Sequence, residues 1–512
     1  MNECLLYNMN ECFLYNFKKL NEVDTNALIC DDEIYTWKKY YELSLNFAKN
    51  LQDYNCQKKS VAIFSKNCPK YYISIMGIIM GGSIFTGVHP TCGTDEINYI
   101  LDLTETEILC VQNYDTLNSV FICHPLKLII LFDDEPVHPL YKSIKIVNIK
   151  YFFYNFNDSI SSMNLLPVIE QSDIVNYIFT SSTTGKSKCI MRSIEFYNED
   201  IKKRFNIFKW EKIISYLPSS HAFDLASIFF THFVNKGTVY FSKKNIISNV
   251  DDLLIFIEKV EPTMLIGVPR IWEKINEKKE WKKIEKCKLV SSAGILSQEI
   301  ERSFLQNNIK IFNTYGSSEN GLISANDDEN YMMHSVGKVY TSDLKISPDG
   351  EILVKNIFNG YKNDPIATVE FKDADGWLHT GDCGIIKNGF LFITGRKKEI
   401  IVLSTGKKIN PNKIEEKIKI LLPNINNVVV VGNDKKFLSL LIFNTQMLLT
   451  SDVETAINYY NLNADYNCEK IQKFLFINSV LTVENGFLTR SLKMRRGEIV
   501  NFYSEEINSL YN

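Results

Sequence analysis

The sequence lacks closely spaced cysteines, a strong net charge and a long uninterrupted apolar run. Its 12 cysteines come no closer than the step from Cys4 to Cys12, so no CxxC pair is available for zinc or dithiol chemistry. The 57 basic and 60 acidic residues give a net charge of −3, which excludes the positive field typical of nucleic-acid-binding proteins. With 23 glycines, 13 prolines and 45% hydrophobic residues, collagen and disorder are also excluded. We therefore expect a mildly acidic enzyme.

One stretch, Tyr71 to Thr91, is uncharged, but glycines, a histidine and a proline interrupt it, so it predicts a buried strand or helix rather than a membrane span. The first residues do not have the pattern of a signal peptide, and we expect reduced thiols and a cytoplasmic location. A peripheral contact with an intracellular membrane stays open. At the start of the chain, MNECLLYN at 1–8 is repeated as MNECFLYN at 9–16, and we expect residues 1–29 to form a tail.

Short apolar runs alternate with helical patterns along most of the chain. The runs begin near residues 61, 127, 177, 238 and 263, and residues 36–54 carry an apolar stripe with helical spacing. This alternation predicts an α/β fold with layered, mostly parallel sheets over residues 30–395. The polar run at 396–399 predicts a hinge, and residues 396–512 predict a small, mobile α+β domain, with a helix at 414–422 and strands at 428 and 437.

The sharpest local feature is YIFTSSTTGKSKC, from Tyr177 to Cys189, in which an apolar strand leads into hydroxyl residues, a glycine and lysines. Hydroxyls, backbone N–H groups and lysines on a turn are the donors that an oligophosphate needs. A kinase-type phosphate loop would need a glycine where Thr180 stands, so that interpretation fails. Taken alone, the segment favours a phosphate-binding turn, with a polar strand-to-helix turn as the alternative.

Further segments make the chain recognisable. The turn reads TSSTTGKSKC, similar to TSGTTGxPKG, and it is followed by SYLPSSHAFD at 215–224, YGSSE at 315–319, GWLHTGDCG at 376–384 and a hinge-like segment at 395–415. In this order the segments resemble the adenylate-forming (AMP-binding) superfamily. VEPTMLIGVPRIWEKI at 260–275 and LTRSLKMRR at 488–496 are similar to segments of long-chain acyl-CoA synthetases, and bubblegum-type enzymes look closest.

The resemblance implies a role for particular residues. Lys493, His221 and Glu319 would be catalytic, Thr184 and Glu319 would hold Mg²⁺, and Glu399 and Gly406 would lie at the hinge and on the coenzyme A side. Ser292, Ala293 and Gly294 would line the acyl pocket. The ATP-binding residues would be Thr180, Ser181, Ser182, Thr183, Thr184, Gly185, Lys188, Tyr315, Gly316, Ser317, Ser318, Asp382 and Arg396.

The implied activity is ATP-dependent ligation of a long-chain fatty acid to coenzyme A, through an acyl-adenylate, with release of AMP and pyrophosphate. ATP, Mg²⁺ and coenzyme A are the implied cofactors and substrates. Two alternatives stay open: a degenerate protein that binds acyl-adenylate or lipid without turnover, and a ligase that transfers the acyl group to another acceptor. Ser182, Ser187 and Cys189 replace glycine, proline and glycine of the superfamily pattern, and a side chain at 182 or 189 would be strained if the backbone there had a positive φ.

Overall fold

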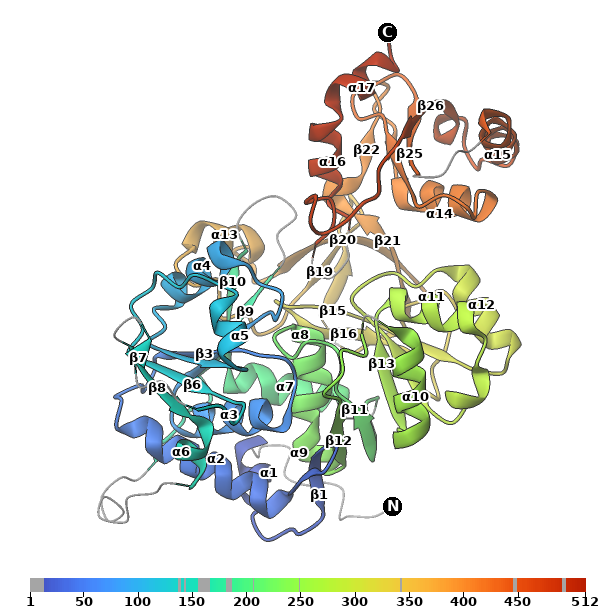
Figure 1. Ribbon diagram of the computed structural model, residues 1–512. Helices are drawn as coiled ribbons and strands as arrows, with labels where there is room; N and C mark the ends of the chain where they lie inside the picture. Colours follow the sequence, from blue (N-terminus) through green and yellow to red (C-terminus); the bar gives the residue numbers. More distant parts are fainter. Residues whose placement is uncertain are drawn as a thin grey trace. The chain divides into compact units, whose positions relative to one another are not determined.

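The computed structural model describes residues 13–136, 140–141, 144–154, 166–180, 187–205, 207–247, 249–340, 343–444, 449–489 and 494–512. The described residues form two compact units (Figure 1). The first contains the residues up to Thr180, then Cys189–Asp343 and Lys355–Leu378. The second contains Leu344–Val354 and His379–Asn512, together with Ser187 and Lys188. The chain therefore passes between the units more than once, and the predicted boundary at residue 395 stays a prediction.

One sheet of the first unit has the strand order β10-β9-β4-β3-β5-β6-β8-β7. Its neighbours from β9 to β8 run parallel, and β10 and β7 are antiparallel edge strands. The strands are β3 (Ser60–Phe64), β4 (Ile84–Val88), β5 (Ile108–Val111), β6 (Leu128–Leu131), β7 (Leu140–Tyr141), β8 (Ile144–Asn148), β9 (Ile174–Phe179) and β10 (Cys189–Ser193). Strands β3 to β6 are buried throughout, as expected for a parallel sheet covered on both faces.

The first unit also contains strands in the order β17-β16-β15-β14-β13-β11-β12-β1-β2. Strands β15 to β1 run parallel in this order, and β16, β17 and β2 are antiparallel. They are β1 (Asn26–Cys30), β2 (Glu33–Thr36), β11 (Lys212–Ile214), β12 (Thr238–Phe241), β13 (Met264–Gly267), β14 (Lys288–Ser291), β15 (Ile311–Ser317), β16 (Gly321–Ala325) and β17 (Lys338–Val339).

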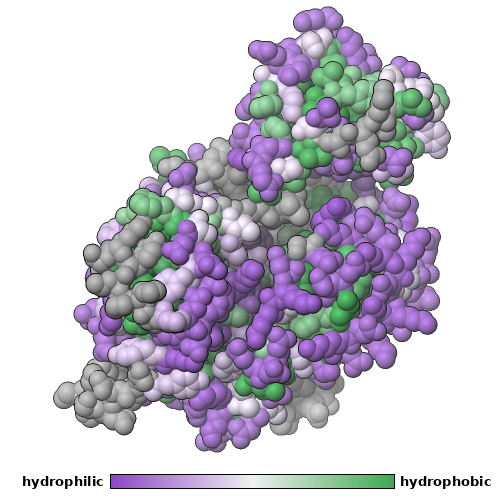
Figure 2. Space-filling view, viewed as in Figure 1, coloured by the Kyte–Doolittle hydropathy of each residue, from purple (hydrophilic) through white to green (hydrophobic). Residues whose placement is uncertain are grey.

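The helices of the first unit cover these sheets (Figure 1). They include α2 (Trp37–Gln52), α3 (Pro69–Met80), α4 (Thr94–Thr104), α6 (Ile149–Tyr154), α7 (Ile194–Arg204), α8 (Ala222–Asp224), α9 (Thr231–Asn235), α10 (Val250–Val260), α11 (Pro269–Lys278), α12 (Gln298–Gln306) and α13 (Pro365–Phe371). Helix α2 matches the predicted stripe, and Thr36 caps it by accepting a hydrogen bond from Lys39 N at 3.2 Å. On the face that Figure 2 shows, hydrophilic side chains predominate over α10 to α12.

The expectation of a tail over residues 1–29 is wrong for its described part. Helix α1 (Phe13–Lys18) and strand β1 belong to the first unit. Phe13 and Phe17 are each 1% exposed, and their rings lie 5.0 and 5.1 Å from those of Phe230 and Phe233. Burying two aromatic side chains stabilises the segment enough to fix it on the core. The first copy of the repeat lies outside the described residues.

The second unit begins with strands in the order β18-β19-β20-β21: β18 (Leu344–Ile346), β19 (Glu351–Val354), β20 (Leu378–Lys387) and β21 (Phe390–Arg396). After the short pair β22 (Ile401–Val402) and β23 (Lys408–Ile409) comes the sheet β24-β25-β26. Its strands are β24 (Asn427–Val431), β25 (Leu438–Phe443) and β26 (Ile471–Ile477), and its helices are α14 (Pro411–Leu421), α15 (Thr450–Leu462), α16 (Arg496–Phe502) and α17 (Ser504–Ser509).

The valine run of β24 explains why helices cover both faces of this small sheet. Val428 and Val430 pack with α14 and α15, whereas Val429 and Val431 pack with α16 and α17. Alternate side chains of a strand point to opposite faces, so a continuous apolar run buries both. These elements confirm the predicted α+β character of the C-terminal region and the α/β character of the first unit. Among the described residues, no helix is both long and apolar enough to cross a bilayer.

Candidate active site

The segment YGSSE ends strand β15 and enters the turn that leads to the antiparallel strand β16. The Ser317 hydroxyl accepts hydrogen bonds from the backbone N–H groups of Glu319 and Asn320, at 3.2 and 3.1 Å. At Gly316, a β-carbon would lie 2.2 Å from the carbonyl oxygen of Gly321, so no larger residue fits. Two residues that the resemblance assigns to ATP binding therefore also shape this turn.

A tyrosine from a later part of the chain holds the Glu319 carboxylate. Tyr361 is buried and its hydroxyl donates a hydrogen bond to Glu319 Oε1 at 3.0 Å. Burial, and next the charge of Glu319, raise the pKa of Tyr361 well above its ordinary value, so the hydroxyl remains a donor at neutral pH. Among the described residues, no donor reaches the second oxygen, Oε2.

The residues predicted for the acyl pocket follow the carboxyl end of β14, beside the strand that carries Tyr315. The Ser292 hydroxyl donates a hydrogen bond to the Thr314 carbonyl at 3.3 Å, so the two predicted regions are adjacent. Ala293 has a φ of +65°, which is unusual for a residue with a β-carbon. Gly294 is exposed, and a β-carbon there would lie 3.2 Å from Pro269. In parallel sheets, ligands bind at this end of the strands.

His221 lies at the N-terminus of the short helix α8, where its Nδ1 accepts a hydrogen bond from Phe223 N at 3.3 Å. The turn before it rests on Asn67. The Asn67 side chain accepts from Ser219 N at 2.9 Å and donates to the Leu217 carbonyl at 2.6 Å. The histidine is thus attached to a fixed, buried turn.

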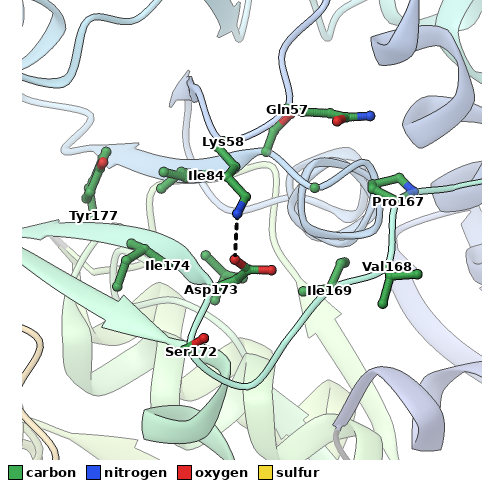
Figure 3. Close-up of a pocket in the computed structure, with 13 residues that line it drawn as sticks. Gln57, Lys58, Ile84, Pro167, Val168, Ile169, Ser172, Asp173, Ile174 and Tyr177 are labelled. Carbon is green, nitrogen blue, oxygen red and sulfur yellow. Dashed lines mark ion pairs between the residues drawn. The ribbon is translucent and has the colours of Figure 1, made fainter.

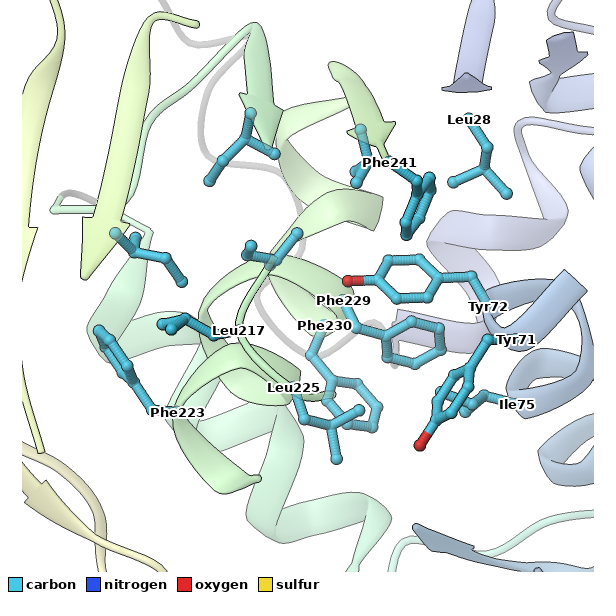
Figure 4. Close-up of a cluster of buried hydrophobic side chains, with 14 of the residues drawn as sticks. Leu28, Tyr71, Tyr72, Ile75, Leu217, Phe223, Leu225, Phe229, Phe230 and Phe241 are labelled. Carbon is cyan, nitrogen blue, oxygen red and sulfur yellow. The ribbon is translucent and has the colours of Figure 1, made fainter. Parts of the chain in front are cut away.

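Asp224, three residues after His221, is a buried carboxylic acid. It accepts a hydrogen bond from the Ser219 hydroxyl through Oδ2, while Oδ1 has no partner among the described residues. Aromatic side chains surround this region, and Figure 4 shows Tyr71, Tyr72 and Phe223 within the cluster. Burial raises the pKa of Asp224 to about 7, because a charged carboxylate loses its hydration there.

Asp382 and Arg396 lie opposite each other in the hairpin β20–β21 of the second unit. Arg396 Nε is 3.3 Å from Asp382 Oδ1. The hairpin is also attached to β19 next to this pair, because Gly381 N donates a hydrogen bond to the buried Glu351 carboxylate at 3.0 Å. The structure therefore brings together two of the residues that the resemblance assigns to ATP binding.

The predicted hinge forms a short 3₁₀ helix over Lys397–Glu399. Lys397 Nζ is 2.8 Å from carboxylate oxygens of both Asp349 and Glu351. Hydrogen bonds to these two carboxylates raise the pKa of Lys397 above its ordinary value. Glu399 accepts a bond from Asn412 Nδ2 at 3.4 Å, and Gly406 has a φ of +76° in the turn between β22 and β23.

Comparisons with known proteins give two family matches along the chain. Residues 18–356 match the family described as AMP-binding enzyme, and residues 398–512 match the AMP-binding enzyme C-terminal domain. The chain belongs to the AMP-binding enzyme family. It is 26% identical to the long-chain-fatty-acid–CoA ligase ACSBG2 of Xenopus laevis, over 93% of this chain and 79% of that protein. The human ACSBG2 is also 26% identical, over 94% of this chain and 88% of the relative. These relatives confirm the resemblance to bubblegum-type enzymes.

Solved structures share the fold of this chain. The anthranilate CoA ligase AuaEII, in complex with anthranoyl-AMP, superimposes with a TM-score of 0.83 over 99% of this chain and 100% of that one, at 15% identity. ATP-bound MatB of Rhodopseudomonas palustris superimposes with a TM-score of 0.76 over 96% of this chain and 98% of that chain, at 16% identity.

Several predicted site residues, listed here together, lie outside the described residues: Ser181, Ser182, Thr183, Thr184, Gly185 and Lys493. Thr180 follows β9, and Lys188 precedes β10. The segment therefore joins two antiparallel strands, which corrects the strand-to-helix alternative. Cys189 is not in the left-handed region, contrary to the condition for strain. It lies in β10, with a buried side chain that packs against Ile84 and Tyr177.

Sequence reasoning missed two residues that hold the predicted site in this family member. Tyr361 is 42 residues from Glu319, and Arg192, which donates to the Ser318 carbonyl, is 126 residues away from its partner. Neither separation leaves a local pattern. The sequence signal at Arg192 is an arginine that directly follows apolar residues of a strand, because an arginine buried in such a strand needs a hydrogen-bond partner.

The residues present fit a Mg²⁺ ion that is carried by the nucleotide. Among the described residues, no group of three or more histidine, cysteine, aspartate or glutamate side chains could hold a metal by itself. Mg²⁺ is usually bound through one or two carboxylates together with substrate phosphates and water. A single carboxylate with one oxygen that no described donor reaches, as at Glu319, fits this kind of site.

A cavity of about 330 Å³ lies elsewhere in the first unit (Figure 3). Lys58 Nζ is 3.2 Å from Asp173 Oδ1 across it, and Ile84, Ile169 and Tyr177 are among its lining residues. None of the predicted site residues lines it. We therefore do not assign the reaction to this cavity.

Proposed function

We propose that this protein joins a long-chain fatty acid to coenzyme A, using ATP and passing through an acyl-adenylate. The substrate class is supported by alignment of 93% and 94% of the chain with relatives named long-chain-fatty-acid–CoA ligases. The chemistry is supported by one observation above all. Tyr361 holds the Glu319 carboxylate at a strand-end turn, in a family that binds AMP.

In the first step, a carboxylate oxygen of the fatty acid attacks the α-phosphorus of ATP and pyrophosphate leaves. Negative charge accumulates between the two anions, so donors that are already in place lower the barrier. Lys493 and the hydroxyls of residues 180–184 would donate to the phosphates. Glu319, with Thr184, would hold Mg²⁺, which offsets phosphate charge when it is bound.

Binding and orientation fall to other residues. Tyr315 would lie against adenine, and Asp382 would accept hydrogen bonds from the ribose hydroxyls, with Arg396 beside it at 3.3 Å. Ser292, Ala293 and Gly294 would line the acyl pocket, with His221 at the reacting carboxylate. Each group would keep the reactants aligned, which lowers the entropy lost at the transition state.

In the second step, the coenzyme A thiol attacks the acyl carbonyl and AMP leaves. Lys493 and Gly406 both belong to the C-terminal region, and each would serve a different step. A rotation about residues 396–399 would present Lys493 first and the Gly406 side second. Domain closure of this kind is a known catalytic gate.

The test is ATP–pyrophosphate exchange across fatty acids of different lengths, followed by thioester detection after coenzyme A is added. We expect exchange with long chains and thioester formation. Lys493→Ala should lower exchange by roughly 10² to 10³, because a preorganised charge is lost. Lys436→Ala, at an exposed lysine of the same unit, is the matched control and should retain exchange.

The outcomes separate the alternatives. Exchange without thioester would indicate a ligase that uses another acceptor. Binding of acyl-adenylate without exchange would indicate a protein that has lost turnover. Exchange that survives Lys493→Ala at the original rate would show that Lys493 is not the adenylation lysine.

A further inference from the structure

Arg192 is a buried arginine with no acidic partner in the part of the chain that the structure describes. Its residue is 1% exposed, and its guanidinium lies 4.5 Å from the ring centroid of Phe196. Nε and NH2 both donate to the Ser318 carbonyl, at 3.1 and 2.6 Å, and NH1 donates to the Tyr197 hydroxyl at 3.2 Å. Burying a charge without a countercharge is unfavourable unless hydrogen bonds compensate for the lost hydration. The bonds to Ser318 and Tyr197 supply this compensation, and they hold the guanidinium in one place.

The accepting carbonyl places Arg192 next to the candidate metal ligand. Ser318 directly precedes Glu319, so two charge-assisted bonds to its carbonyl fix the peptide that carries Glu319. At the other end of the Glu319 side chain, the Tyr361 hydroxyl donates a hydrogen bond to the carboxylate at 3.0 Å. Glu319 is thus restrained at its backbone by Arg192 and at its carboxylate by Tyr361.

The backbone of Arg192 is also held in place, by the sheet. In the sheet it lies opposite Asn176 of β9, and the Tyr197 hydroxyl that it contacts donates to Asn176 Oδ1 at 2.6 Å. Asn176 in turn donates to the Phe85 carbonyl of β4 at 2.9 Å. Strands β9 and β10 flank the segment predicted to bind the ATP phosphates. Arg192 therefore connects those strands to the turn that carries Glu319.

The turn has a separate attachment to helix α7 that does not involve Arg192. Asp200 accepts a hydrogen bond from Leu322 N at 2.7 Å and is ion-paired with Arg204. Strand β16 would thus remain attached to α7 without Arg192. What Arg192 adds is the orientation of the Ser318–Glu319 peptide.

We propose that Arg192 is a positioning residue for Glu319, linking the strands around the phosphate segment to the carboxylate that would hold Mg²⁺. The proposal rests on the proposed function for its consequence in catalysis. The structural part of the proposal is that Arg192 orders the Ser318–Glu319 peptide, and this order can be measured in the free protein.

The first experiment compares Arg192→Met and Arg192→Lys with the unchanged protein. Arg192→Met keeps the bulk but removes the donors, and we expect the Mg²⁺ concentration for half-maximal pyrophosphate exchange to rise about tenfold. Arg192→Lys keeps the charge, cannot place two donors on one carbonyl, and should give a smaller rise. Ile201→Ala, which opens a cavity under the same helix α7, is the control that should lower the melting temperature without shifting the Mg²⁺ requirement.

A double-mutant cycle with Glu319→Gln identifies the route of the effect. If Arg192 acts through Glu319, the double variant should be no worse than Glu319→Gln alone. Effects that multiply would overturn the proposal. So would a Mg²⁺ shift in Arg192→Met no larger than that in Ile201→Ala.

Amide hydrogen exchange of the free protein separates this proposal from the proposed function. The N–H groups of Glu319 and Asn320 should exchange faster in Arg192→Met and, to a smaller extent, in Arg192→Lys, and not in Ile201→Ala. If the unchanged protein shows no pyrophosphate exchange, the proposed function is contradicted, but amide hydrogen exchange still tests the positioning role of Arg192. Amide exchange rates at Glu319 and Asn320 that stay the same in both Arg192→Lys and Arg192→Met would overturn that role. If Arg192→Met does not fold, Arg192→Lys alone decides.

Discussion

The two units hold their predicted site residues by different kinds of contact. In the first unit the supporting groups are deeply buried: Arg192 and Asp224 are each 1% exposed, and the Asp200–Arg204 pair has side chains that are 4% and 6% exposed. In the second unit the supporting cations are half-exposed, with Lys397 at 45% and Arg396 at 47%.

This difference has a physical consequence. Buried contacts are poorly screened by salt and allow one arrangement, whereas half-exposed ion pairs are screened and can re-form after a movement. A fixed Glu319 together with a hinge that can rearrange is what the proposed two-step reaction needs. The following predictions test the contrast.

The largest effect is expected at Arg204 of the first unit. Arg204→Met leaves Asp200 buried without its cation, and breaking such a pair costs about 3 to 5 kcal/mol of unfolding free energy. The loss should be nearly the same in low salt and in about 1 M salt. Urea unfolding of both proteins at the two salt concentrations checks this. A loss that disappears in high salt would mean that the pair is not shielded from solvent.

Asp224 should make the stability of the first unit depend on pH. Its pKa is raised from 3.8 to about 7 in the folded protein. Protonation of Asp224 therefore contributes its full stabilisation below pH 3.8, and this contribution is lost as the pH rises through about 7. Asp224→Asn removes the titration and should become relatively more stable over that range, by up to about 4 kcal/mol.

Urea unfolding from pH 4 to pH 8 measures this difference, with Asp95→Asn at an exposed aspartate as the control. A difference between Asp224→Asn and the unchanged protein that stays constant with pH would contradict the prediction. The control should show no comparable trend.

In the second unit, Asp382→Ala should weaken binding of ATP. The proposed hydrogen bonds from the ribose to a charged carboxylate contribute about 1.5 to 3 kcal/mol each. Calorimetric titration measures the affinity, and Asp452→Ala, at an exposed position of the same unit, should leave it unchanged. Equal affinities of Asp382→Ala and the unchanged protein would remove Asp382 from the site.

The smallest effect is expected at Lys397. Because this lysine is 45% exposed, Lys397→Met should cost about 1 kcal/mol in low salt and clearly less in about 1 M salt. The neighbouring exposed Lys398→Met is the matched control. A salt-independent loss as large as that of Arg204→Met would abolish the contrast between the two units.

Local patterns were enough to predict part of the fold. The apolar stripe at 36–54 predicts α2, which runs over Trp37–Gln52, and the run at 428 predicts β24, over Asn427–Val431. Helical spacing, strand runs and caps act between residues a few positions apart, so they can be read along the chain. The ordered segments from 177 to 415 likewise identify the family.

The same reasoning failed where distant residues meet. Phe13 was assigned to a tail because its partners, Phe230 and Phe233, are far along the chain. The strain considered at Cys189 required a positive φ, which the strand β10 does not have. Only the sheet order decides which side chains share a core and which backbone conformation a position adopts.

The sequence by itself therefore determined the fold class, the family and the identity of the candidate site residues, because these depend on periodicity and on short ordered segments. The tertiary structure alone decided what holds those residues. Tyr361 meets Glu319 across 42 positions, and Arg192 meets the Ser318 carbonyl across 126. Such contacts depend on how strands pair and how deeply a side chain is buried, and no spacing within the sequence specifies either.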